Sequence, residues 1–179
     1  MRTLATRPGL RPAAALLSLA LLPGAARAGD ACHRMDTADF AVLDGCVQRA
    51  PDTLKISAAA LARLNYDGNG LAALMAGRQH YYVRRDGTQL AVISYDNGPD
   101  AFADGLVRAR IDGRIGYFNV QLQPAFAERF SWGFPFQDGM AEVCNGCHAG
   151  QPDAGGHSSI VGGTRFSIDR HGRHLSAPR

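Results

Sequence analysis

Hydrophobic and polar residues alternate through the middle of the chain, which is the pattern of β-strands with one buried face. The clearest run is residues 107–112, where Val107, Ala109 and Ile111 fall on one face and charged residues on the other. Gly113 follows as a tight turn, and a return strand begins two residues later. We therefore predict an antiparallel hairpin in this region.

A similar region precedes this hairpin. We predict an outgoing strand over residues 71–75, a turn at Gly77 and a return strand over residues 81–83. The pair Asp86-Gly87 then signals a second turn, and residues 90–93 supply a third strand. Each unit is thus expected to be a small meander.

A short motif repeats at a regular spacing along these regions. Its three copies are Asn69-Gly70-Leu71-Ala72, Asp104-Gly105-Leu106-Val107 and Asp138-Gly139-Met140-Ala141, spaced 35 and 34 residues apart. A fixed period in this range is typical of repeat proteins, whose units bury their apolar faces by stacking. We therefore expect a mainly β fold over residues 65–179, with about three meander or β-hairpin repeats of about 35 residues stacked in a solenoid-like array.

Residues 29–64 form a leader with a different pattern. The run 57–64 is rich in alanine and leucine and begins with a serine that can cap a helix. A second short helix is predicted over residues 37–43, ended by Gly45. We expect a short, disulfide-tied α-helical cap on one open end of the repeat stack. The alternative is a flexible N-terminus held by the same disulfide.

Aromatic connectors close the first two units, at residues 95–102 and 130–136. Phe102 and Phe136 both stand three residues before a repeat glycine. Large apolar side chains at matching repeat positions usually form the core between units. Trp132 is the expected exception, because its indole N–H needs a hydrogen-bond partner.

The first 28 residues have the order of an export signal. Arginines precede the apolar run 13–22, and small residues at 26–28 provide a cleavage site. The apolar run is too short to span a bilayer. The chain has a formal net charge of +3, and loss of the four arginines of the signal (3 − 4) leaves about −1. We therefore expect a periplasmic or secreted protein with no membrane span after cleavage and no nucleic-acid partner.

The chain has four cysteines, and this even number in an exported protein predicts disulfides. Three pairings are possible. The pairing of Cys32 with Cys46 and of Cys144 with Cys147 is favoured, because each pair is local in sequence and lies outside the predicted repeat strands.

Several segments share the order Asp-Gly-Leu, a strand, a glycine and a polar turn. They are Tyr66-Asp67-Gly68-Asn69-Gly70-Leu71-Ala72, Tyr81-Tyr82-Val83-Arg84-Arg85-Asp86-Gly87, Phe102-Ala103-Asp104-Gly105-Leu106 and Gly163-Thr164-Arg165-Phe166-Ser167-Ile168-Asp169-Arg170. This order resembles the WG-repeat proteins, a bacterial family of β-hairpin repeats, over roughly residues 65–174. The Trp-Gly pair that names the family stands here at residues 132–133, in a connector. The resemblance implies an interaction or ligand-binding scaffold and no catalytic residues.

The third unit is interrupted by an insertion that opens with Cys144-Asn-Gly-Cys147-His148. Glycine and proline are frequent in it, which indicates a loop over residues 144–159. Insertions in repeat proteins often lie on the binding face. The plainest interpretation is a local disulfide that stiffens the base of this loop and leaves His148 exposed.

The same opening has three other interpretations. C-x-x-C-H is the signature of c-type haem attachment, in which Cys144 and Cys147 bond the porphyrin and His148 ligates iron. No methionine follows Cys147 as the usual second iron ligand. Together with His157, the same residues offer a zinc ligand set. A C-x-x-C pair also occurs in redox enzymes, where a helix N-terminus lowers the thiol pKa.

Other catalytic motifs are absent from the sequence, including G-x-S-x-G, H-E-x-x-H and a phosphate-binding glycine loop. We therefore expect an exported, non-enzymatic β-repeat module without a cofactor. Its partner is expected to be a protein or a cell-envelope component, with Trp132, His148 and His157 as candidate binding residues. The alternative is a c-type haem protein for electron transfer or haem sensing.

Overall fold

The computed structural model describes residues 30–36, 40–95 and 97–175. These residues form a mainly β protein, as predicted, with one short helix. The export signal expected at residues 1–28 lies outside the described residues. In the part of the chain that is described, no helix is long and apolar enough to cross a membrane.

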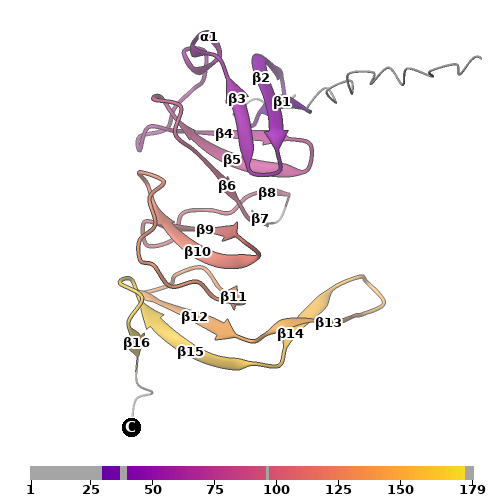
Figure 1. The fold of residues 1–179 in the computed structure, drawn as a ribbon, viewed down its shortest axis with the longest axis vertical. Helices are drawn as coiled ribbons and strands as arrows, with labels where there is room; N and C mark the ends of the chain where they lie inside the picture. Colours follow the sequence, from indigo (N-terminus) through magenta and orange to yellow (C-terminus); the bar gives the residue numbers. More distant parts are fainter. Residues whose placement is uncertain (1–29, 37–39, 96, 176–179) are drawn as a thin grey trace, which may run out of the picture.

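The leader and the first repeat unit share one six-stranded antiparallel sheet, with the strand order β3-β2-β1-β4-β5-β6 (Figure 1). The strands are β1 (Ala31–Arg34), β2 (Val42–Ala50), β3 (Thr53–Ile56), β4 (Leu71–Ala76), β5 (Gln79–Arg84) and β6 (Gln89–Val92). The three strands β4, β5 and β6 are the meander predicted for the first unit, including the turn at Gly77.

One side chain links the two edges of this sheet. The amide of Gln89 on β6 accepts a hydrogen bond from the backbone N–H of Leu54 on β3 (2.6 Å) and donates one to the Leu54 carbonyl (2.9 Å). The sheet is therefore curled almost into a barrel. Its interior is filled by buried apolar residues, among them Leu43, Leu54, Leu74, Tyr81 and Val83.

The prediction of a helical cap over residues 29–64 is wrong for most of the leader. Val42 and Leu43 belong to β2, and residues 37–39 lie outside the described residues. The helix α1 (Ala58–Leu61) is a single turn capped by Ser57, shorter than the predicted run. The leader is extended because Leu43, Cys46 and Leu54 are buried in the interior of this sheet. β1 pairs with both β2 and β4 and so joins the leader strands to the first unit.

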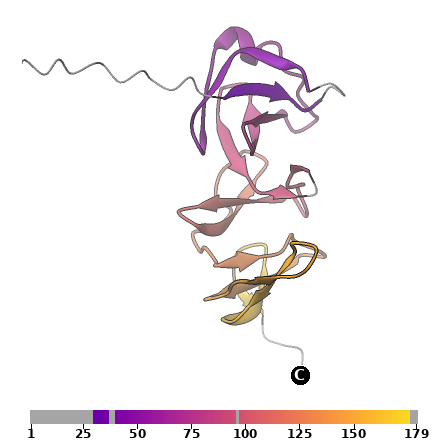
Figure 2. The same ribbon diagram turned by 90° about the vertical axis from the view of Figure 1, so that its right-hand side faces the viewer.

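The middle of the molecule is the predicted hairpin of β9 (Leu106–Ile111) and β10 (Arg114–Asn119). A short pair, β7 (Ser94–Tyr95) and β8 (Gly98–Pro99), connects it to the six-stranded sheet. Figure 2 shows that the sheet, the β9–β10 hairpin and the C-terminal strands follow one another along the long axis.

The C-terminal strands form a four-stranded sheet in the order β11-β12-β15-β16. They are β11 (Trp132–Gly133), β12 (Met140–Asn145), β15 (Thr164–Asp169) and β16 (His174–Leu175). The prediction of a loop between β12 and β15 is also wrong, because most of this insertion is a β-hairpin. Its strands β13 (His148–Pro152) and β14 (Ser158–Val161) are joined by a turn in which the Asp153 carboxylate accepts hydrogen bonds from two backbone N–H groups.

We call residues 148–161 the arm, because this hairpin projects sideways from the body (Figure 1). Nearly all of its side chains are exposed.

The aromatic connectors contribute to the core largely as predicted. Phe130 and Phe136 are buried between the middle hairpin and the C-terminal sheet, and Phe102 packs on Tyr82. Tyr95 and Phe134 depart from the prediction, since 67 % and 43 % of them are exposed.

Candidate functional site

Cys144 and Cys147 form a disulfide, and the other disulfide joins Cys32 on β1 to Cys46 on β2. This is the pairing favoured from the sequence. Cys144 is the fifth residue of β12, and Cys147 stands just before the arm. Both are buried, whereas His148 is exposed.

The disulfide lies where the two strands of the arm enter and leave the body. Gly146, Gly162 and Gly163 all have positive φ angles there. A Cβ at Gly163 would collide with the backbone of residues 145–147. The Sγ atom of Cys147 lies 2.9 Å from the Gly162 carbonyl oxygen. The cross-link and this close backbone crossing give the arm a stiff base.

The site does not fit covalent haem attachment. Thioether formation needs two free, accessible thiols beside a porphyrin face. Here the two sulfurs are bonded to each other, and Cys144 and Cys147 are only 2 % and 8 % exposed. We derive no haem chemistry from this motif.

The four residues of the zinc set are not brought together in this structure. No group of three or more histidine, cysteine or carboxylate side chains in the described ranges is placed to hold a metal. His157 lies in the turn at the tip of the arm, whereas the cysteines lie at its base. A catalytic redox pair gains no support either, because both cysteines are buried and neither stands at a helix N-terminus.

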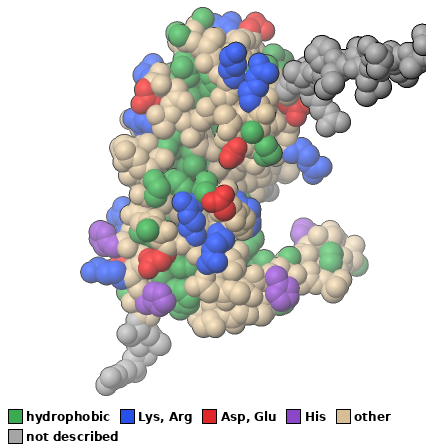
Figure 3. All heavy atoms as spheres, viewed as in Figure 1, with side chains coloured by type: hydrophobic (Ala, Val, Ile, Leu, Met, Phe, Trp, Pro, Cys, Tyr) green, Lys and Arg blue, Asp and Glu red, His purple; other side chains and the backbone are tan. Residues whose placement is uncertain are grey.

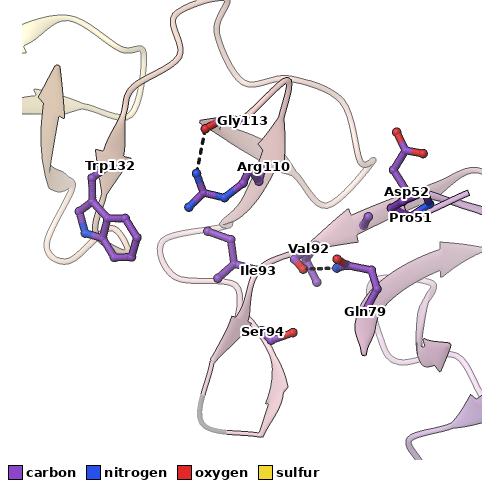
Figure 4. A pocket seen from close by; sticks show the side chains of 10 residues that line it. Pro51, Asp52, Gln79, Val92, Ile93, Ser94, Arg110, Gly113 and Trp132 are labelled. Atoms are coloured by element: carbon purple, nitrogen blue, oxygen red, sulfur yellow. Dashed lines mark hydrogen bonds between the residues drawn. The ribbon is translucent and has the colours of Figure 1, made fainter. Parts of the chain in front are cut away.

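A groove crosses the molecule between the six-stranded sheet and the base of the arm (Figure 4). We call it the central groove. It consists of two neighbouring hollows that share Arg110, Gly113 and Trp132. The first is also lined by Pro51, Asp52, Gln79, Ala91, Val92, Ile93 and Ser94, and the second by Arg114, Ser131, Cys147, His148, Ala149 and Ile160.

Trp132 stands at the junction of the two hollows. It is half-buried, and its ring is held by an edge contact with Phe134. The next residue must be glycine, because a Cβ at Gly133 would collide with the Tyr117 hydroxyl. The buried indole N–H of Trp132 has no hydrogen-bond partner among the described residues. A buried donor without an acceptor costs about 1–3 kcal/mol. Because this N–H is closed off from the groove, the ring of Trp132 is the part that a ligand can contact.

A buried ion pair fixes the connector that carries Trp132. The Asp100 carboxylate accepts hydrogen bonds from the backbone N–H, Nε and Nη2 of Arg108, at 3.0, 2.9 and 2.6 Å. Arg108 Nη1 donates to the Gly133 carbonyl at 2.9 Å. The hydroxyl of Tyr117 donates to the Phe134 carbonyl at 2.7 Å, and burial raises the pKa of this hydroxyl. The tryptophan is therefore attached to a rigid support.

Two arginines place positive charge in the groove. Arg110 is exposed and donates through Nη1 to the Gly113 carbonyl at 2.8 Å. Arg114 donates to the Arg129 carbonyl and to the Asn145 side chain. Neither arginine makes an ion pair within the described part of the chain. Among the lining residues, Asp52 is the one carboxylate, and it stands at the opposite end from Trp132 (Figure 4).

One serine–histidine contact lies at the groove wall. Ser94 Oγ is 2.7 Å from Nδ1 of the buried His80, and burial lowers the pKa of this histidine. A hydrolytic serine–histidine pair needs a third group that orients the ring. The other ring nitrogen, Nε2, has no partner in the described residues. The pair therefore lacks the third group that a hydrolytic serine–histidine site needs.

Of the candidate residues expected from the sequence, the structure brings together Trp132 and His148 and leaves His157 outside the groove. Sequence reasoning missed Asp52, Gln79 and Arg110. Arg110 lies on the polar face of an alternating strand, where the pattern alone does not distinguish a binding side chain from a solvated one.

Comparisons with protein-family models, curated proteins and solved structures find no match for this chain.

Proposed function

We propose that the chain is an exported, non-enzymatic β-repeat module that binds a component of the cell envelope in the central groove. The indole ring of Trp132, which lines both hollows at their junction, carries this proposal. A preformed groove with an aromatic side chain and a few polar groups is the usual form of a ligand site.

A repeat organisation of the WG type is part of the proposal. Gly70, Gly105 and Gly139 have φ angles of 75°, 77° and 80° and each stands just before the first strand of its unit. The backbone N–H of Gly139 donates to the Asp104 carboxylate at 2.7 Å, so equivalent turns of consecutive units are in contact. These features support units of one design that stack in a solenoid-like array.

An oxidising, extracytoplasmic location also belongs to the proposal. It is supported by the two disulfides, which persist in such compartments and rarely in the cytosol. The rigidity of the site supports binding. The ion pair of Asp100 with Arg108 pre-organises the groove, and pre-organisation reduces the entropy that binding costs.

The test is retention of envelope material by immobilised protein. Protein, lipid and polysaccharide fractions of the exporting cell are passed over wild type, Trp132→Phe, Trp132→Ala and His157→Gln. His157→Gln is the matched control, because it alters an exposed ring at the arm tip. Circular dichroism checks that each variant folds.

We expect wild type and His157→Gln to retain one fraction equally. Trp132→Phe keeps an aromatic ring but a smaller one, so its retention should fall between those of wild type and Trp132→Ala. Failure of wild type to retain any fraction would overturn the proposal. So would equal retention by a folded Trp132→Ala variant.

A further inference from the structure

Donors outnumber acceptors along the central groove. Arg110 and Arg114 provide hydrogen-bond donors and positive charge. Asp52 is the one carboxylate among the lining residues, and it already accepts a hydrogen bond from Thr53. A complementary ligand is therefore rich in acceptor oxygens and negatively charged near the arginines.

The groove is elongated and open, which suits a chain longer than a single small molecule. The first hollow begins at Pro51 and Asp52 on the leader, and the second ends at His148 and Ile160 on the arm. Their volumes are about 480 and 420 Å³. In the space-filling view the arm stands away from the body and leaves an open hollow beside it (Figure 3). A linear ligand can thus cross from one hollow to the other past Trp132.

In this groove, side chains are more available than backbone groups to bind a ligand. The N–H of Ile93 donates to the Arg108 carbonyl, and the Ile93 carbonyl accepts from Asp100. The Gly113 carbonyl accepts from Arg110, and the strand that holds Trp132 pairs with β12. A peptide that adds to a sheet needs a free strand edge, which these paired groups do not provide. This disfavours an extended peptide.

The remaining side chains have the shapes that bind sugars. An indole ring packs on the aliphatic C–H face of a sugar ring, and Trp132 lies at the junction of the two hollows. The planar groups of Arg110, Gln79 and Asp52 can each engage neighbouring hydroxyls or carboxylates. The Gln79 amide nitrogen is already held by the carbonyls of His80 and Val92, which fixes the side chain at the wall (Figure 4).

We propose that the central groove binds an acidic oligosaccharide, with a sugar ring on Trp132 and a sugar carboxylate at Arg110. This rests on the proposed function and names the ligand class of the same site. The single carboxylate of the lining argues for binding without cleavage, because glycoside hydrolysis usually needs a pair.

The experiment follows the fluorescence of Trp132, which is the one tryptophan of the chain. Purified mature protein is titrated with oligogalacturonate, with a neutral cello-oligosaccharide and with an oligoglutamate peptide. The variants are Arg110→Gln, which keeps the size but removes the charge, and Arg173→Gln as the matched control. Arg173 is an exposed arginine that does not line the groove.

We expect oligogalacturonate to change the emission saturably, more weakly at high salt, and without release of reducing ends. Arg110→Gln should weaken this binding about tenfold or more, since a charge-assisted hydrogen bond is lost. Arg173→Gln should bind as wild type does.

Three results would overturn the acidic-glycan assignment while leaving the binding module in place. They are preference for the neutral sugar, preference for the peptide, and no response to any probe from a protein that still retains an envelope fraction. Equal weakening of oligogalacturonate binding by Arg110→Gln and Arg173→Gln would also overturn it. The loss would then follow the net charge of the protein and not a contact in the groove. Absence of probe binding together with absence of fraction retention would overturn both proposals.

Discussion

The ion pair of Asp100 and Arg108 offers the sharpest test of how the middle of the molecule is held together. Its side chains are 3 % and 5 % exposed, and the closest nitrogen–oxygen distance is 2.6 Å. The perturbation is Asp100→Ala. It removes the acceptor of three hydrogen bonds and leaves the guanidinium and the backbone N–H of Arg108 buried.

The expected loss follows from this burial. Removal of one partner of a buried pair typically costs about 3–5 kcal/mol, because the other charge is left uncompensated. The exposed pair of Arg165 and Glu142 is the matched control, with side chains 42 % and 49 % exposed. Glu142→Ala should cost at most about 1 kcal/mol, because solvent screens such pairs.

The assay is urea unfolding of both variants, followed by circular dichroism and by Trp132 emission. The emission is informative because Arg108 also donates to the carbonyl of Gly133, beside the tryptophan. A double variant, Asp100→Ala with Arg108→Met, completes a mutant cycle. It should cost less than the sum of its single variants by about 0.5–3 kcal/mol, since no lone charge then stays buried.

One outcome would refute this reasoning. If Asp100→Ala cost no more than Glu142→Ala, the pair would behave as a solvated surface contact. Strict additivity in the mutant cycle would refute the coupling in the same way.

Three further predictions concern other parts of the molecule. Gln89→Leu should cost about 1–3 kcal/mol and speed hydrogen exchange at the Leu54 amide, because both backbone groups of that buried residue lose their partner. Burial lowers the pKa of His80, so the stability that its neutral ring provides is full above about pH 6.5 and is lost as the pH falls toward the lower folded pKa. Urea unfolding between about pH 7 and 5 should therefore show a shallower loss for His80→Gln than for wild type, and identical slopes would contradict this. Replacing both Cys144 and Cys147 by alanine should cost no more than about 2 kcal/mol in thermal or urea unfolding, because the closed ring is so short, and a larger loss would indicate that the disulfide supports more than the arm.

The strands of the first and second predicted units could be predicted because their pattern is local. Residues 107–112 alternate strictly, and Gly113 supplies the positive φ angle of 78° that the turn needs. The outgoing strand of the first unit does not alternate, but it is a short apolar run that ends at the turn glycine Gly77. In these segments, pairing between neighbours in the chain is enough to specify the structure.

The leader was mispredicted because its strands depend on distant partners. Cys32 and Leu43 are buried only when β1 pairs with β4 and β2. Gly45, with a φ angle of 83°, interrupts the alternation of β2. The run Thr53-Leu54-Lys55-Ile56 does alternate and was the one local signal of a strand.

The candidate site was predicted in part. Trp132 was singled out because an indole N–H needs a partner, and the structure places that N–H buried and unpartnered at the groove. Asp52 and Arg110 were missed because they line the same hollow only when the leader and the second unit face each other. No spacing in the sequence encodes that approach.

The manner in which the arm enters the body has a consequence for its sequence. The ladder between β12 and β15 runs without a register shift from Met140 and Asp169 to Asn145 and Thr164. The hairpin leaves and returns through this last pair, so the host sheet is complete without it. The arm is thus separable from the host sheet. A hairpin of another length or composition grafted between Asn145 and Thr164 would keep the strands that carry it but would replace the residues through which the arm lines the second hollow.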